Sequence, residues 1–136
     1  MGDLTDGFSR LPVTLLGNLL WAFFGGGLIT AIEYCMAGLI CSVTVVGLPF
    51  GLQCFKISGL ALAPFGKEYT GPSLNPLGCV GNALWIGLAG IWIFLSHVSL
   101  ALALAMTVIG LPFAVQHIKL AMVALAPFGV DVRMAD

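Results

Sequence analysis

Charge is what this sequence has least of. Lys, Arg, Asp and Glu make up 8 % of its 136 residues, against roughly 25 % in an ordinary soluble domain. Hydrophobic residues make up 60 %, and mean hydropathy is +1.08. A soluble domain of this size could not bury so much apolar surface. The composition therefore excludes a soluble enzyme, a nucleic-acid-binding protein and a disordered chain, and predicts an integral membrane protein.

The few charged residues leave two long stretches almost uncharged. Glu33 is the only charged residue between Arg10 and Lys56, and none lies between Glu68 and Lys119. About 20 apolar residues cross a bilayer core, so each stretch is long enough for more than one crossing. The N-terminus lacks the cationic start of a signal peptide, and we expect the first apolar stretch to stay in the mature protein.

Residue sets that perform chemistry are also missing. The four cysteines have no Cys-x-x-Cys spacing, and the sequence has no Ser-His-Asp set, no paired carboxylates and no phosphate-binding loop. From these absences we expect that the protein is not an enzyme and has no metal or cofactor site.

What the sequence does contain is a duplication. Residues 44–66 and 107–129 share 14 of 23 positions. The matching segments are Gly17–Trp21 with Gly81–Trp85, Thr44–Phe50 with Thr107–Phe113, and Ala61–Gly66 with Ala124–Gly129. The pattern predicts one membrane domain over 1–136, with repeats at 13–66 and 77–129. A polar linker at 67–76, with Gly and two Pro, is predicted to be a solvated loop.

The doubled motif Gly-Asn-x-x-Trp, then Val-x-Gly-Leu-Pro-Phe-x-x-Gln-x-x-Lys, then Ala-Pro-Phe-Gly resembles the YccF family of small bacterial inner-membrane proteins. The resemblance covers nearly the whole chain. It implies an inner-membrane location and two repeats, and it carries over no catalytic residue.

Each repeat divides at its Gly-Leu-Pro turn. Its first leg, Val13–Val46 in repeat one, would be about 51 Å long as a single helix, so it must tilt or break, and Gly25-Gly26-Gly27 is the weak point. Shorter second helices are predicted from Pro49 to Ala63 and from Pro112 to Ala126, since Pro suits a first turn. We therefore expect an all-α membrane protein, built as a pseudo-two-fold helical bundle.

Two topologies fit these legs. In the first, each repeat is a hairpin with two crossings, and Arg10, Lys67 and Arg133 share one face, which is the positive-inside pattern. In the second, each first leg crosses once and each second leg lies flat at the interface, which gives inverted repeats. The sorting of the loop charges favours the multi-pass hairpin arrangement, which implies parallel repeats.

The Gln-x-x-Lys motif is the first candidate site. Gln53 with Lys56, and Gln116 with Lys119, each share a helix face shortly after a Pro-started helix N-terminus. Two lysines near two such termini could bind anions or line a pore. Alternatively, each lysine extends to lipid headgroups and each glutamine joins two helices.

Glu33 and His97 are the second candidate. They are 64 residues apart, at what the repeat spacing makes equivalent positions, inside their first legs. An intramembrane ionisable residue is a functional hypothesis by default, so the pair could form a proton or polar relay. The alternative places Glu33 at a membrane edge and makes His97 a packing residue.

Two further features are expected to be structural. Asn18 and Trp21 share a helix face, as do Asn82 and Trp85, which suits an interface anchor or an interhelical hydrogen bond. Small residues at four-residue spacing predict close helix packing, including contacts between subunits.

These features favour a homo-oligomeric channel or transporter for small anions, lined by the Gln-x-x-Lys motif. The runner-up is a non-conducting scaffold that binds anionic lipid or a partner membrane protein. A third hypothesis is a proton-coupled carrier that uses Glu33 and His97.

Overall fold

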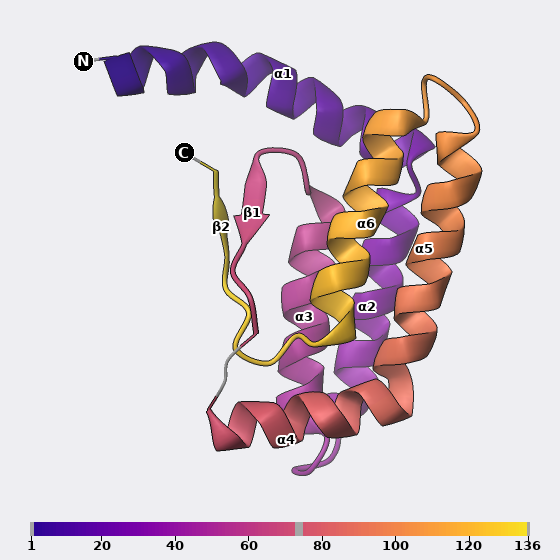
Figure 1. The fold of residues 1–136 in the computed structure, drawn as a ribbon. Coiled ribbons are helices and arrows are strands. Elements are labelled where there is room, and N and C mark those ends of the chain that lie inside the picture. Colours follow the sequence, from indigo (N-terminus) through magenta and orange to yellow (C-terminus); the bar gives the residue numbers. More distant parts are fainter. Residues whose placement is uncertain (1, 73–74, 136) are drawn as a thin grey trace.

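A computed structural model describes residues 2–72 and 75–135 of the chain, most of them in helices (Figure 1). The elements are α1 (Gly2–Phe24), α2 (Gly27–Ser42), α3 (Leu48–Leu62), β1 (Lys67–Tyr69), α4 (Pro76–Trp85), the π-helical turn η1 (Ile86–Gly90), α5 (Ile91–Ala105), α6 (Leu111–Leu125) and β2 (Val132–Met134).

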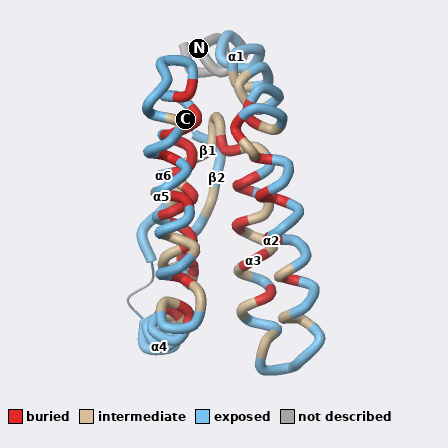
Figure 2. The backbone as a smooth tube through the Cα atoms, turned by 90° about the vertical axis from the view of Figure 1, so that its right-hand side faces the viewer, coloured by how far each residue is buried: buried red, intermediate tan, exposed pale blue. Residues whose placement is uncertain are grey.

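Four helices form two hairpins that stand side by side. α2 packs against α3, α5 packs against α6, and α3 contacts α6 between the hairpins. α1 and α4 lie across opposite ends of these four helices (Figures 1 and 2). α2 and α5 run in opposite directions, so an approximate two-fold axis perpendicular to the four helices relates the two repeats (Figure 1). The repeats are therefore inverted, and the parallel arrangement that the favoured hairpin topology implied is wrong.

The first leg of repeat one breaks inside its glycine run. α1 and α2 meet at 74°, and Gly26 between them has a φ of 82°, which only glycine adopts readily. A Cβ at Gly27 would lie 2.0 Å from the indole nitrogen of Trp21, so the bend also needs a bare backbone there. Repeat two instead stays helical from Pro76 to Ala105 and contains η1.

The second legs start in the same way in both repeats. Pro49 and Pro112 lie in the first turns of α3 and α6, where the absent N–H has no intrahelical partner to lose. Each helix ends at the Leu before Ala-Pro-Phe-Gly, in which Gly66 and Gly129 have positive φ.

The linker is not simply a loop, which corrects the purely helical prediction. β1 lies inside the 67–76 segment and pairs antiparallel with β2 from the C-terminal tail. Glu68 is opposite Arg133 in this ladder, and their side chains form an ion pair of 2.8 Å. The two-fold relation brings the extended segments that follow α3 and α6 together, and the β1–β2 ladder satisfies their backbone hydrogen-bonding groups.

Many large hydrophobic side chains are exposed on the surface. The tips of both hairpins are apolar and more than 80 % exposed, at Val43, Val45, Val46, Met106, Val108 and Ile109. Pro76–Ala105 is long and apolar enough to cross a membrane, and the bent pair α1–α2 is a second candidate span. Such a surface is suited to lipid or to further protein copies. The start of α1 and the β1–β2 ribbon lie on one side of the molecule (Figure 1).

Candidate functional site

The duplicated Asn and Trp side chains tie the first leg of each repeat to the end of its own second helix and to the Ala-Pro-Phe-Gly segment that follows. The indole N–H of Trp21 donates to the carbonyl of Ala61 at 2.6 Å, and Asn18 exchanges two hydrogen bonds with the backbone of Phe65. Repeat two makes the same contacts, from Trp85 to Ala124 and between Asn82 and Phe128. Both tryptophans are buried. These four side chains therefore hold the end of each second helix against the start of its first leg.

The duplicated lysines tie each repeat to the other one. The Lys56 ammonium donates to the carbonyls of Pro127 and Val130, the latter at 2.9 Å. The Lys119 ammonium donates to Pro64 at 2.8 Å and Lys67 at 2.9 Å. Both lysines thus compensate carbonyl groups just beyond the C-terminal end of the partner repeat's second helix, where a cation is favourable.

The glutamines of the same motif have a different environment. The side-chain oxygens of Gln53 and Gln116 are buried and have no hydrogen-bond partner among the described residues. Such an oxygen is satisfied by a donor or a cation. The motif therefore places its lysines on carbonyl groups and leaves its glutamine oxygens as orphan acceptors.

A chain of hydrogen bonds crosses the interface between the hairpins. The Tyr34 hydroxyl lies 2.8 Å from Nε2 of His97, and Nδ1 of His97 lies 3.1 Å from Nδ1 of His117. Nε2 of His117 lies 2.9 Å from the carbonyl oxygen of Gly25, at the break between α1 and α2. All three side chains are buried, with exposed fractions of 7 %, 4 % and 1 %.

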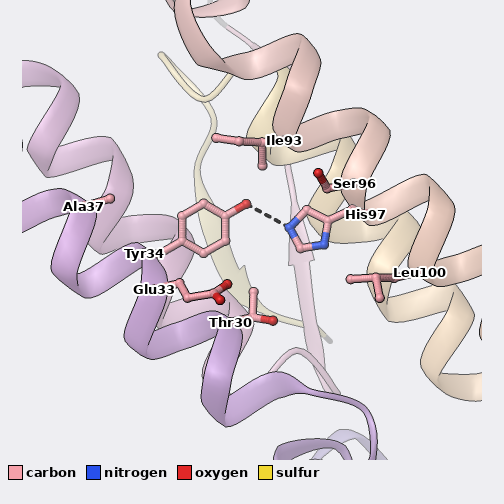
Figure 3. Close-up of a pocket in the computed structure, with 8 residues that line it drawn as sticks. All are labelled: Thr30, Glu33, Tyr34, Ala37, Ile93, Ser96, His97 and Leu100. Atoms are coloured by element: carbon pink, nitrogen blue, oxygen red, sulfur yellow. Dashed lines mark hydrogen bonds between the residues drawn. The ribbon is translucent and has the colours of Figure 1, made fainter.

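Glu33 stands beside this chain rather than in it. Two cavities between α2 and α5 are lined by Glu33 and Thr30: one of about 260 Å³ that also contains Tyr34 and His97, and one of about 440 Å³ that contains His117. Figure 3 shows the Glu33 carboxylate in the first cavity, on the same side of α2 as the Tyr34 ring. Glu33 is exposed, whereas the other members of the group are buried.

The structure changes the pairing that repeat spacing suggested. Repeat one is one residue longer than repeat two between its Trp and its Gly-Leu-Pro turn, and this residue falls at the α1–α2 break. Beyond the break the offset is 63, so the counterpart of His97 is Tyr34, and Glu33 corresponds to Ser96. Tyr34 and His97 are therefore equivalent residues that meet each other, as residues near a two-fold axis do.

Sequence reasoning did not include His117 or Gly25 in the relay. His117 replaces the Cys54 of repeat one, and this difference within a conserved stretch of the duplication was the available signal. The hydroxyl groups of Thr30, Ser96 and Ser99 do not join the chain and donate to carbonyls of their own helical segments, at Gly26, Trp92 and Leu95.

A third cavity, lined partly by cationic side chains, lies on the side of the β1–β2 ribbon. Its volume is about 470 Å³, and Lys56, Lys67 and Arg133 line it together with apolar residues such as Phe55 and Leu60. Burial lowers the pKa of Lys67 below its ordinary value, and its ammonium donates to the carbonyl of Gly59 at 3.0 Å. Among the described residues, no group of three or more His, Cys, Asp or Glu could hold a metal ion.

Comparison with known proteins agrees with this division into repeats. The family model YccF, described as an inner membrane component domain, matches residues 16–67 and again residues 80–130. The chain is 32 % identical over 117 residues to the inner membrane protein YccF of Escherichia coli K12, which covers 79 % of each chain. The same values hold for its counterpart in Shigella flexneri. No solved structure matches.

Two matches to one domain, together covering most of the chain, agree with the duplicated motif and with the inner-membrane character of the relatives. The chain therefore belongs to the YccF family of inner-membrane proteins.

Proposed function

We propose that this inner-membrane protein is a proton-coupled carrier whose solute site lies between the two repeats. The observation that carries the proposal is the buried hydrogen-bonded chain from Tyr34 through His97 and His117, next to cavities that Glu33 lines. Binding sites of secondary transporters with internal repeats lie at the repeat interface. Ionisable side chains inside a membrane are costly and mark ion or proton pathways.

The differences between the repeats support this location. Residues that hold the scaffold are identical in the two repeats, as Asn18 with Asn82 and Lys56 with Lys119 illustrate. Every polar side chain that lines the cavity between α2 and α5 differs from its counterpart. The apolar residues of these helices differ as well, since 28–43 and 91–106 are identical only at Leu39 and Leu102. What sets the polar group apart is that its members are buried and bond to one another across the repeats.

The test is proton movement in proteoliposomes under an imposed pH gradient. A pH-sensitive dye inside the vesicles reports proton entry while candidate solutes are added outside. We expect proton entry that needs both the gradient and a solute, and a loss of at least tenfold in Glu33→Gln. Ser99→Ala, which changes only an exposed hydroxyl bonded to its own helix, is the matched control. Solute uptake that ignores the pH gradient would contradict the proposal.

The homo-oligomeric anion channel remains the second candidate, on the observation that two equivalent lysines recur. It requires Lys56 and Lys119 to release carbonyl partners that each now holds. Chloride efflux from liposomes, compared between the native chain and Lys56→Ala, decides it. Efflux that the substitution abolishes, without loss of folded protein, would favour the channel.

The scaffold hypothesis is supported by the cavity that Lys56, Lys67 and Arg133 line, because three cations beside apolar side chains suit an anionic headgroup and the start of its acyl chain. It predicts anionic lipid that co-purifies with the native chain and is lost in Lys67→Gln. No transport of any kind would accompany this binding.

A further inference from the structure

The contact partners fix the direction of every hydrogen bond in the Tyr34–His97–His117 chain. The Gly25 carbonyl can only accept, so Nε2 of His117 must carry a hydrogen. In a neutral His117 the other nitrogen, Nδ1, is then an acceptor. Nδ1 of His97 must therefore be the donor in the 3.1 Å contact between the rings.

The same reasoning extends to the tyrosine. With its hydrogen on Nδ1, neutral His97 presents Nε2 as an acceptor, and the Tyr34 hydroxyl is the donor across 2.8 Å. The neutral chain thus has one arrangement, in which Tyr34 donates to His97, His97 to His117, and His117 to Gly25. Every buried nitrogen of both rings has a partner in this arrangement.

One extra proton can enter without breaking a contact. A proton taken from water binds Nε2 of His97, and the resulting N–H donates to the Tyr34 oxygen. The tyrosine keeps its own hydrogen, which turns away into the cavity that Glu33 lines. If the charge moves to His117, its Nδ1–H donates to His97, which still carries a hydrogen on Nε2. In both forms Tyr34 has changed from donor to acceptor.

A second proton can enter only at lower pH, because it breaks the contact between the rings. With both rings charged, each Nδ1 carries a hydrogen, and the two N–H groups face each other across 3.1 Å. Neither then has an acceptor, and two like charges share a buried site. In its first transition the ring pair therefore takes up one proton.

The surroundings suit one positive charge. Glu33 is the only formally charged residue among those lining the two cavities, and it lines both. From α3, the titratable group on this side is the thiol of Cys54, which is buried. From α1, the Trp21 ring lies tilted by 56° to the His117 ring, with centroids 4.7 Å apart, and an aromatic ring this close stabilises a cation.

We infer that Tyr34, His97 and His117 form a site that binds a single proton between the two repeats, with Glu33 as its counter-charge and the Tyr34 hydroxyl as the group that changes direction. The inference deepens the proposed function by giving a stoichiometry of one proton per chain. It rests on the proposed function for what the bound proton is used for. The Tyr34 hydroxyl presents a hydrogen-bond donor to the cavity only when the proton is bound. The lining of the cavity therefore differs between the neutral and the protonated site.

The experiment is ¹⁵N NMR of the full chain, labelled at histidine and held in phospholipid nanodiscs, from pH 8 downward. The chain has two histidines in all, so each signal is assigned with one variant. At pH 8 we expect hydrogen on Nδ1 of His97 and on Nε2 of His117. On acidification, one further N–H per chain should appear, with the second following at least about two pH units lower.

Variants then test the two groups around the rings. Tyr34→Phe removes the acceptor for the new N–H, and Glu33→Gln removes the counter-charge. Each should lower the midpoint of the first protonation by about one pH unit, whereas Ser99→Ala should leave it unchanged. The native tautomer pattern at pH 8, with one ring carrying its hydrogen on Nδ1 and the other on Nε2, is a readout that needs no variant.

Three results would overturn the inference: the opposite tautomers at pH 8, uptake of two protons in one transition, or an unchanged midpoint in Tyr34→Phe. Its failure is separable from that of the proposed function. One-proton uptake without transport retains the site and rejects the carrier, while coupled transport with two-proton uptake does the reverse.

Discussion

Repeat one and repeat two share one set of hydrogen-bonded contacts that hold the scaffold together, which we call the joints. They differ in the buried polar residues that lie between the repeats. The joints are the same on both sides: an indole on a carbonyl, an asparagine on a phenylalanine backbone, and a lysine on the other repeat's carbonyls. Where the repeats face each other between α2 and α5, Tyr34 meets His97, and His117 stands where repeat one has Cys54.

The comparison teaches which residues to test for function. A residue that recurs with the same partner is explained by the scaffold, and the lysines belong to this class. A residue that differs from its counterpart, and is buried with polar neighbours, is not explained by the scaffold. By this criterion, the Tyr34–His97–His117 chain is a stronger candidate for function than Lys56 and Lys119.

The largest expected effect concerns the shared indole joints. Trp21→Ala and Trp85→Ala each empty a buried site and orphan a carbonyl, and each should lower the free energy of unfolding by about 3–5 kcal/mol. Trp92, which is 67 % exposed, is the control and should lose far less. Thermal unfolding in a mild detergent measures all three. A large difference between Trp21→Ala and Trp85→Ala would mean that the joints are not equivalent.

The lysine joints come next. Lys56→Met and Lys119→Met each remove two charge-assisted hydrogen bonds to the opposite repeat, and we expect each to cost about 2–3 kcal/mol. Lys67→Met loses one bond on an accessible side chain and should cost under about 1 kcal/mol. The same unfolding assay applies. Variants as stable as the native chain would show that these lysines are held for another purpose, and would revive the pore-lining hypothesis.

Much of the fold was predictable from the sequence because the duplication repeats local signals. Gly-Leu-Pro predicts where α3 and α6 begin, and the glycine run at residues 25–27 predicts the weak point that becomes the α1–α2 break. The β1–β2 ribbon was not predictable, since three-residue strands have little pattern of their own and pair only because the two-fold relation brings distant tails together.

The candidate site was predictable only in part. Glu33 and His97 were identified because ionisable residues inside apolar stretches are rare. Their assumed equivalence was wrong by one residue, because the sequence does not show where the extra residue of repeat one is absorbed. The bond from His117 to Gly25 joins residues 92 positions apart, and the carbonyls bound by the lysines belong to the other repeat. Such contacts follow from the tertiary arrangement.

Replacing a residue of one repeat by its counterpart from the other tests how the repeats differ, with a smaller expected loss of unfolding free energy. His117→Cys places the repeat-one residue in repeat two, removes the acceptor for His97 and orphans the Gly25 carbonyl. We expect a loss of about 1–2 kcal/mol in unfolding free energy, and a one-proton titration in which His97 behaves as a single independent group. Cys54→Ala, on the equivalent helix, should leave the titration unchanged. Native-like proton uptake in His117→Cys would show that the ring pair is not the binding unit.

The smallest expected effect concerns the two ways in which the first legs bend. Gly26→Ala forces a Cβ onto a φ of 82° and should cost about 1 kcal/mol, although nothing crowds the position. Gly87→Ala lies in η1, also in open space but with ordinary φ, and should be neutral or stabilising by up to about 1 kcal/mol because alanine favours helix. Unfolding midpoints of the two variants, compared directly, give the difference. Equal effects would mean that the α1–α2 break does not depend on the left-handed residue, and that the two repeats bend for the same reason after all.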